Sequence, residues 1–352
     1  MKRRLLVAVP LLLGVALLAW LLRPKREPLG QAYVSERSVT LFNSLAQVRQ
    51  PVGALRYGER VEVLGRRGDN VRVRTSEGTT GWVDGQRLID PPLWQRSVQL
   101  LAQARGMPVQ ARGRTKVSSN ARVQPGRTEP RLYQFNRGSP VEILGRAVAD
   151  WVQVPDEKEP AGQPQETKKE DWFLVRGVAN RGLGEGGIKE QGSGTGSEAG
   201  DQSVPVAGWV VARFVELDLP DAIREGASSA GMRVLAWFEL SRVPDRQGER
   251  PQYLVAGARG PEGLACDFTM VRVYTWGAKR GQYETAFIAN DLCGKLPIHA
   301  AKLPAGDAEF RFAEMGDSLG KERIYRMRQT VVRRVREAEE KPKSQRKPPP
   351  PR

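Results

Sequence analysis

The sequence contains only two cysteines and one histidine: Cys266, Cys293 and His299. A structural zinc site usually takes four ligands of these types, so we expect no metal site. A Ser-His-acid or Cys-His catalytic unit would have to use His299, because the chain has no other imidazole. Lys295 and Lys321 each follow a glycine, but neither precedes Ser or Thr, so no Walker phosphate loop is present. The sequence therefore predicts no cofactor, no catalytic residue and a protein that is not an enzyme.

Acidic residues are in the minority, with 40 Asp and Glu against 56 Lys and Arg and a formal net charge of +16. Such a charge attracts anionic partners, and the attraction weakens as the salt concentration rises. The basic residues are spread along the chain, and no nucleic-acid recognition motif accompanies them. We therefore expect no specific nucleic-acid partner, whereas lipid head groups and acidic wall polymers remain candidates.

Apolar residues are also few, at 39% of the chain, whereas Gly and Pro are frequent, at 37 and 25 residues. Both residue types break helices, and both are common in the turns between short strands. Beyond the linker 23–31, short alternating apolar runs separated by glycines are typical of antiparallel strands. Composition and pattern together predict a mainly β protein.

The one long apolar run is residues 5–22, which follow a basic start at residues 1–4. Its length suits the hydrocarbon core of a bilayer, although a secretory signal peptide begins in the same way. We favour an uncleaved signal anchor, because the run is longer than a usual signal core and its best cleavage site, residues 14–16, lies inside it. Basic residues flank both ends, so the positive-inside rule barely decides the orientation. We expect a single-pass membrane protein with the bulk of the chain outside the cytoplasm.

The two cysteines leave two arrangements open. A disulfide between Cys266 and Cys293 would form if their domain lies in an oxidising compartment. Two buried free thiols are the alternative, and the sequence pattern does not favour either arrangement over the other.

An internal repeat is the most informative feature of the sequence. Residues 58–66 (GERVEVLGR) recur as residues 138–146 (GSPVEILGR), and each copy continues with an alternating apolar run and ends in Gly-Trp-Val. The apolar runs are residues 70–73 and 151–154, and the Gly-Trp-Val segments are residues 81–83 and 208–210. In this order the segments resemble the bacterial SH3 (SH3b) family. Residues 120–126 (NARVQPG) are similar to the opening motif of the family, whereas residues 39–42 (VTLF) lack its Asn and Arg.

The resemblance covers residues 32–90 and 113–218 and implies two closed β-barrels of short strands. The predicted fold class is therefore mainly β, with an N-terminal transmembrane helix, two SH3-like small β-barrels and a C-terminal antiparallel β domain. The predicted segments are the basic N-terminus 1–4, the transmembrane signal anchor 5–22, the linker 23–31, the first barrel 32–90, a helical spacer 91–112, the second barrel 113–218 with a long insertion 155–207, the β domain 231–336 and a disordered, basic, proline-rich tail 337–352.

Aromatic residues of the two barrels are the candidate ligand-binding residues. They are Tyr57, Trp82, Trp151 and Trp209. Packing in the core or at the rim of a barrel is the alternative role for the two tryptophans of Gly-Trp-Val, and their exposure would discriminate between the roles. Gly81, which precedes Trp82, predicts a sharp bend that brings the indole over the end of the barrel.

The C-terminal part predicts a small antiparallel sheet or sandwich of about six strands. The expected strands are residues 232–240, 253–258, 268–276, 283–289 and 309–312. Residues 271–287 have the pattern of a hairpin, residues 324–335 fit a strand slightly better than a helix, and His299 is expected in a loop or at a strand edge.

These features predict an envelope protein that binds a wall ligand without catalysing a reaction. Members of the bacterial SH3 family often bind wall peptides, so the resemblance implies peptidoglycan or another anionic wall polymer as the partner. The alternative is a membrane-tethered scaffold that recruits an envelope protein through the barrels and the C-terminal β domain. Binding to purified peptidoglycan would separate the two hypotheses.

Overall fold

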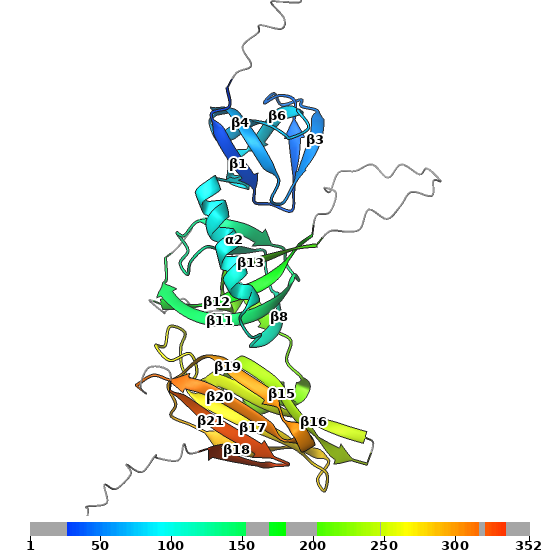
Figure 1. Cartoon of the computed structure of the whole chain (residues 1–352), viewed down its shortest axis with the longest axis vertical. Helices are drawn as coiled ribbons and strands as arrows, with labels where there is room; N and C mark the ends of the chain where they lie inside the picture. Colours follow the sequence, from blue (N-terminus) through cyan, green and yellow to red (C-terminus); the bar gives the residue numbers. More distant parts are fainter. Residues whose placement is uncertain (1–26, 153–168, 181–202, 247, 317–320, 336–352) are drawn as a thin grey trace, which may run out of the picture. The chain divides into compact units, whose positions relative to one another are not determined.

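The structure is a computed structural model, and it describes residues 27–152, 169–180, 203–246, 248–316 and 321–335 (Figure 1). The predicted membrane anchor and the predicted tail lie outside these residues. Within the described part of the chain, no helix is both long and apolar enough to cross a membrane. The described residues form two compact units, which meet between Pro91 and Pro92 in the sequence. Both units consist mainly of antiparallel sheets, which confirms the prediction of a mainly β protein.

The first unit is one seven-stranded antiparallel sheet that curls into a small barrel, called the first barrel below (Figure 1). Its elements are β1 (Gly30–Val34), β2 (Ser38–Phe42), β3 (Pro51–Arg56), β4 (Arg60–Arg67), β5 (Asn70–Arg74), β6 (Thr80–Asp84), the 3-10 turn η1 (Gly85–Arg87) and β7 (Leu88–Ile89). The strand order is β3-β2-β6-β5-β4-β1-β7. Pairing of β2 with β6 brings the two halves of the sheet together around one core.

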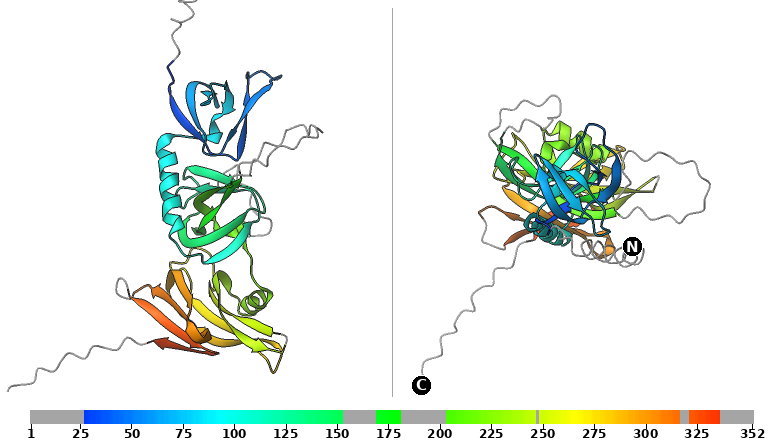
Figure 2. Two further views of the ribbon diagram at one scale, coloured as in Figure 1. Left: turned by 45° about the vertical axis from the view of Figure 1, so that its right-hand side comes forward. Right: turned by 90° about the horizontal axis from the view of Figure 1, so that it is seen from above.

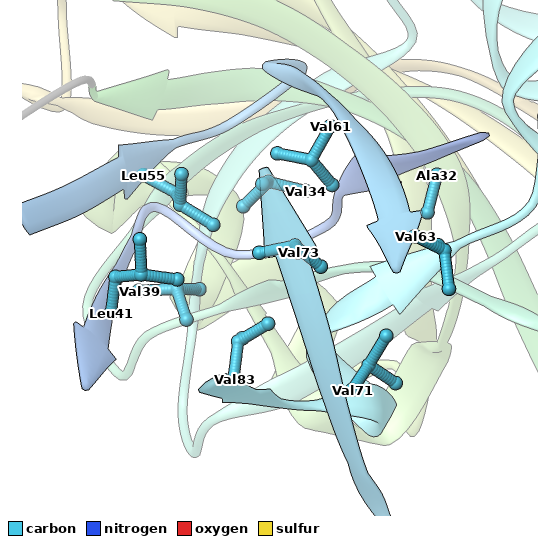
Figure 3. Close-up of a cluster of buried hydrophobic side chains, with 10 residues drawn as sticks. All are labelled: Ala32, Val34, Val39, Leu41, Leu55, Val61, Val63, Val71, Val73 and Val83. Atoms are coloured by element: carbon cyan, nitrogen blue, oxygen red, sulfur yellow. The ribbon is translucent and has the colours of Figure 1, made fainter. Parts of the chain in front are cut away.

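The core of the first barrel follows from the alternation of side chains along each strand. In β5, for example, Val71 and Val73 are buried on either side of the exposed Arg72. Figure 3 shows the core side chains pointing toward one another from several strands. They are Ala32, Val34, Val39, Leu41, Leu55, Val61, Val63, Val71, Val73 and Val83. The strands therefore bury one face and leave the other in solvent, as the alternating pattern predicts.

Gly81 is required because two strands approach each other closely. A Cβ atom at this position would lie 2.5 Å from Cγ of Leu41 and 2.8 Å from the carbonyl oxygen of Phe42. The expected bend is wrong, since β6 runs through Gly81 in unbroken register with β5. The missing side chain instead lets β2 and β6 come together, which places Phe42 beside Trp82.

The second unit begins with the helix α2 (Pro91–Arg105) and a second seven-stranded antiparallel sheet, called the second barrel below. The elements of this barrel are β8 (Ala111–Thr115), β9 (Ser119–Arg122), β10 (Arg131–Phe135), β11 (Pro140–Asp150), β12 (Lys169–Asn180), β13 (Ser203–Val211), the 3-10 turn η2 (Ala212–Phe214) and β14 (Val215–Leu217). Their order, β10-β9-β13-β12-β11-β8-β14, repeats the order of the first barrel strand for strand.

Helix α2 packs on the side of the second barrel (Figure 2). Its Ala104 is fully buried against Leu144 and Leu174 of the barrel, and Leu101 lies next to them. The sequence pattern predicts a helix here, and its Val98 points away from the packed face, since that side chain is 49% exposed. The helix ends at Arg105 and β8 begins at Ala111, so the last residues of the expected spacer 91–112 belong to the barrel.

The strand in the middle of the second barrel is not the one that the repeat predicts. β12 lies between β11 and β13, the position that β5 has in the first barrel. The repeat predicts residues 151–154 for this place, but Trp151 and Val152 form no strand, and residue 153 lies outside the described residues. A single insertion at 155–207 is therefore wrong, because β12 lies within it. Trp172, which is 0% exposed, shows why β12 takes this place: its side chain fills the interior of the unit.

The second unit ends with the helix α3 (Asp221–Ser229) and two four-stranded antiparallel sheets, together called the C-terminal domain. The first sheet is β15 (Arg233–Asp245), β16 (Gly248–Ala258), β17 (Met270–Gly277) and β18 (Gln282–Ala289), in that order. The second sheet is β19 (Gly294–Lys302), β20 (Ala308–Glu314), β21 (Glu322–Arg328) and β22 (Val331–Val335). The ring of Phe287 in β18 lies 5.5 Å from the ring of Tyr325 in β21, so the two sheets face each other.

The C-terminal domain has more strands than the sequence pattern predicts. The hairpin at 271–287 is formed by β17 and β18, with Trp276 opposite Tyr283. Residues 324–335 form β21 and β22, whereas the strand β19 was not expected, since His299 was placed in a loop or at a strand edge. Pro297 interrupts the alternation of β19 and has no backbone N–H to donate to a neighbouring strand. The sequence pattern therefore does not predict this strand.

A buried arginine joins the second barrel to the C-terminal domain. Arg146 of β11 has a side chain that is 1% exposed, and its Nη2 lies 2.5 Å from Oδ1 of Asp171 in β12. The same guanidinium reaches across to Asp267, whose Oδ1 lies 3.1 Å from Nη1. It also donates to the carbonyl oxygens of Leu264 and Cys266, at 2.9 and 3.0 Å. Both carboxylates are buried and each has a second cation, Arg233 beside Asp171 and Lys295 beside Asp267, so Arg146 is the buried cation that the two carboxylates share.

Candidate ligand-binding site

A groove of about 440 Å³ on the first barrel contains one of the predicted ligand-binding residues, Trp82. It is lined by Val39, Thr40, Phe42, Arg49, Asp69, Asn70, Trp82, Val83, Asp84, Gln86 and Arg87. These residues come from β2, from the connection to β3, and from β5, β6 and the η1 turn. A volume of this size lies within the range of small-ligand sites in proteins.

Two aromatic rings and an arginine form one wall of this groove. Phe42 and Trp82 are cross-strand partners in β2 and β6, and both are half-buried. Cζ of Arg49 lies 4.0 Å from the ring centroid of Phe42, a cation–π contact at an exposed position. The wall therefore offers ring faces for stacking and a guanidinium that can donate hydrogen bonds to an anion or a carbonyl oxygen.

Two carboxylates, Asp84 and Asp69, also line the groove. Oδ1 of Asp84 accepts a hydrogen bond of 2.9 Å from the backbone N–H of Gln86, which caps the η1 turn. Its other oxygen, Oδ2, lies 3.9 Å from Nε of Arg87, and Asp69 is exposed nearby. A ligand in the groove would thus meet donors and acceptors as well as rings, which suits a polar polymer better than an apolar one.

The other predicted ligand-binding residues lie elsewhere. Tyr57 is 3% exposed and does not line the groove. Trp151 is half-buried after the end of β11, with Cζ of Arg127 5.9 Å from its ring centroid. Trp209 packs against the cluster of α2 and the second barrel that contains Ala104. The structure therefore does not bring these three residues together with Trp82.

The second barrel differs from the first at the position that corresponds to the groove. Trp209 pairs with Arg122 across β13 and β9, where the first barrel pairs Trp82 with Phe42. The side chain of Arg122 is turned toward the barrel's own backbone, since its Nη1 donates to the carbonyl oxygen of Glu129 at 2.5 Å. An aromatic wall like that of the first barrel is thus missing from the described part of the second one.

Sequence reasoning missed two residues of the groove wall, Phe42 and Arg49. Phe42 lies in the segment 39–42, which lacks the Asn and Arg of the family's opening motif, so the motif does not mark Phe42 as a ligand-binding residue. The signal in the sequence that points to Phe42 is Gly81, the first residue of the Gly-Trp-Val segment. A glycine within a strand often marks the close approach of a neighbouring strand, and here that strand carries Phe42.

The two cysteines and the histidine lie in the C-terminal domain. Cys266 and Cys293 form a disulfide with Sγ atoms 2.00 Å apart, so Cys293 offers no thiol to His299. His299 is half-buried in β19, opposite Arg311. Within the described residues, no group of three or more His, Cys, Asp or Glu side chains is arranged to hold a metal ion.

Comparison with known proteins matches part of the first barrel to a family model. Residues 49–89 match the family model of the bacterial SH3 domain. The chain contains one bacterial SH3 domain. The matched residues run from the connection before β3 to the end of β7, and they include Arg49 and Trp82 of the bacterial SH3 domain's groove. The match does not extend to the second barrel.

Other comparisons are more distant. No curated protein matches the sequence of this chain. Among solved structures, NlpC1 and NlpC2 from Trichomonas vaginalis are similar at 9% and 8% identity, each with a TM-score of 0.17. These matches cover 74% and 76% of this chain and 88% and 98% of the matched chains. An NlpC/P60 family protein from Bacillus cereus matches at 10% identity and a TM-score of 0.20, over 74% of this chain and 94% of that chain.

The prediction that the protein is not an enzyme is contradicted by these matches. They are to NlpC and NlpC/P60 proteins, which are peptidoglycan hydrolases, and they reopen the question of an enzymatic activity. TM-scores of 0.17 to 0.20 do not carry a fold or an active site over to this chain. These matches therefore give no residue of this chain a catalytic role, and the lack of a recognisable catalytic unit in the sequence does not exclude an enzymatic activity.

Proposed function

We propose that the chain is a membrane-anchored protein of the cell envelope whose bacterial SH3 domain binds a cell-wall polymer in the groove around Trp82. The anchor is the apolar run at residues 5–22, and the bulk of the chain lies outside the cytoplasm. The ligand is peptidoglycan or another anionic wall polymer. The observation that carries the proposal is the groove itself, in which Trp82, Phe42 and Arg49 form one wall within or beside the family match.

The chemistry of the groove supports a wall polymer as the ligand. Ring faces stack on the apolar sides of sugar or peptide units, and the Arg49 guanidinium pairs with carboxylates. The formal net charge of +16 favours association with an anionic polymer. The disulfide in the C-terminal domain suits an oxidising compartment outside the cytoplasm.

The second barrel is proposed as a second SH3-like domain with a structural rather than a ligand-binding task. Its strand order equals that of the first barrel, and it repeats the Gly-Trp-Val segment at 208–210. Its tryptophan is engaged with the α2 cluster, and Arg146 ties the barrel to the C-terminal domain. We propose that this barrel serves as the base on which the C-terminal domain is mounted.

The proposal predicts that the full-length chain in mild detergent is retained by purified peptidoglycan at physiological salt. Trp82→Ala should reduce retention about tenfold, because losing a stacking ring costs roughly 1.4 kcal/mol or more. Trp209→Phe should leave retention unchanged, because Trp209 is occupied by internal packing.

A matched pair of arginines separates specific binding from charge. Arg49→Ala and Arg66→Ala remove the same charge from exposed positions of the first barrel, but only Arg49 lines the groove. Retention should fall with the first variant and hold with the second. An equal loss of retention in both variants, or retention at low salt only, would show that the chain binds peptidoglycan through its general positive charge. The alternative, a scaffold that recruits a protein partner, would then be favoured.

A further inference from the structure

Four aromatic rings form a row across the first sheet of the C-terminal domain. The ring centroids of Trp237 and Tyr253 are 6.1 Å apart, those of Tyr253 and Tyr283 are 5.8 Å apart, and those of Tyr283 and Trp276 are 5.2 Å apart. The four residues come from β15, β16, β18 and β17, so the row crosses the sheet. Trp237, Tyr283 and Trp276 are only half-buried, although large rings of this kind usually lie in a core or at an interface.

Helix α3 covers only part of the sheet face that carries this aromatic row. Ile223 and Ala227 of α3 are buried with Met270 and Tyr274 of the sheet. The helix touches the sheet closely there, because a Cβ at Gly226 would lie 2.7 Å from the Tyr274 ring. With nine residues, α3 is too short to cover the whole face, and the aromatic row borders the uncovered part.

A pocket of about 510 Å³ lies at the Trp237 end of the aromatic row. Trp237 and Glu239 of β15 form one side of it, and Lys302 of β19 and Arg112 of β8 form others. Each cation has a carboxylate partner at 3.3 Å, Glu239 for Lys302 and Glu142 for Arg112, but their side chains remain 62% and 68% exposed. Of these charged residues, the two cations and only one carboxylate, Glu239, line the pocket. The pocket is therefore positive in balance and has an indole as one wall, a combination that suits a ring carrying a negative charge.

Ion pairs lie beside the row, in addition to the apolar cluster that Tyr253, Trp237 and Tyr283 share with helix α3. Nε of Arg242 lies 2.9 Å from Oε1 of Glu239, and Nε of Arg250 lies 3.2 Å from Oδ2 of Asp245. Cζ of Arg250 also lies 4.9 Å from the ring centroid of Trp276. Burying such pairs under an apolar partner would be costly, because their hydration would be lost without replacement. Hydroxyl groups, in contrast, can donate to the carboxylates and accept from the guanidinium groups.

The tyrosine hydroxyls in the middle of the row are also available for polar contacts. Tyr253 and Tyr283 share a hydrogen bond through their side chains. Burial raises the pKa of Tyr253 to about 12, with the neighbouring Tyr283 adding to the effect. Both residues therefore keep their protons at neutral pH, and the pair combines ring surface with a hydroxyl donor and acceptor.

We propose that the aromatic row of Trp237, Tyr253, Tyr283 and Trp276 binds an oligosaccharide, with a carboxylate-bearing unit in the adjoining pocket. The apolar faces of the sugar rings lie on the aromatic rings, and the hydroxyls bond to the surrounding ion pairs. The carboxylate lies between Lys302 and Arg112. This site is on the C-terminal domain, so it does not depend on the groove of the bacterial SH3 domain.

The test is isothermal titration calorimetry, which measures the affinity of the full-length chain in mild detergent for each of two soluble probes. One probe is a neutral N-acetylglucosamine tetramer, and the other is a short glycan strand of the wall, freed of peptides, which carries carboxylates. Both should bind, and the acidic strand should bind more tightly. Trp237→Ala should weaken both by about tenfold or more, the equivalent of roughly 1.4 kcal/mol. Lys302→Ala should weaken only the acidic strand.

Two further variants keep the proposal falsifiable. Tyr283→Ala changes a half-buried ring and serves if Trp237→Ala does not fold, and Trp82→Ala in the first barrel should leave both titrations unchanged. If neither probe binds, or if binding survives Trp237→Ala and Tyr283→Ala, the oligosaccharide site is refuted. Binding of a synthetic peptide of residues 337–352 to the row in place of either sugar would equally refute it, and would identify the basic tail as the occupant.

Discussion

Replacing Arg146 by Ala should lower the free energy of unfolding of the second unit by about 3–5 kcal/mol. The Arg146 side chain is 1% exposed and contacts two carboxylates, Asp171 at 0% exposure and Asp267 at 8%. Removing the cation leaves these carboxylates buried with less compensation, which is far more costly than losing a surface ion pair. Asp171 retains Arg233, whose Nη1 lies 3.0 Å from Oδ2, so the loss should stay within this range.

Native-state hydrogen exchange of the full-length chain in urea measures this change for each strand separately, so the first barrel does not contribute to it. Arg114→Ala is the matched control, because the side chain of Arg114 is 61% exposed and its Nε lies 3.7 Å from Oδ1 of Asp218, which is 50% exposed. Its effect should be within about 0.5 kcal/mol. A loss below about 1 kcal/mol for Arg146→Ala would mean that water or neighbouring groups compensate the two carboxylates.

Removing the disulfide should destabilise the C-terminal domain by about 3.5 kcal/mol. Cys266 and Cys293 are separated by 27 residues, and closing a loop of this length restricts the unfolded chain by about this amount. The double variant Cys266→Ser with Cys293→Ser should therefore unfold at lower urea concentration than the parent chain. Dithiothreitol should have the same effect on the parent and none on the variant.

The disulfide and Arg146 act on one loop, since Arg146 donates to the carbonyl oxygen of Cys266. Their effects should therefore be coupled, and the triple variant should lose less than the sum of the separate losses. Equal unfolding midpoints with and without reductant would show that the two cysteines contribute nothing to stability. A strictly additive triple variant would show that the loop does not link them.

Much of the first barrel could be predicted from its sequence, because its strands are short, alternate regularly and are separated by glycines. Val71 and Val73 are buried as their spacing predicts, and Trp82 lines a groove. The partner ring of Trp82 could not be predicted in the same way. Phe42 is brought beside it by a strand pairing across the barrel, and no local pattern records that pairing.

The second barrel shows where local pattern is insufficient. Residues 151–154 carry an alternating apolar pattern, whereas residues 172–175 are a continuous apolar run, and either pattern is compatible with the strand between β11 and β13. Tertiary packing decides for β12, because Trp172 and Val175 have 0% exposure there and Asp171 meets Arg146. Trp209 is an equivalent case, since the same Gly-Trp-Val segment lines a groove in one barrel and packs beneath α2 in the other.

The C-terminal domain carries features that sequence reasoning did not single out. Its aromatic row unites residues from four strands, and the members are far apart in the sequence. Only the hairpin of β17 and β18, which places Trp276 opposite Tyr283, was visible as a local signal. The other two rings join it through the sheet order, which a single sequence does not reveal.

The most direct test of wall binding by the bacterial SH3 domain is hydrogen–deuterium exchange of the full-length chain with and without soluble peptidoglycan fragments. Binding in the groove predicts slower exchange in the peptides that contain Phe42 to Arg49 and Trp82 to Arg87, and loss of this protection in Trp82→Ala. Unchanged exchange in both segments at saturating fragment concentration would contradict wall binding through this groove.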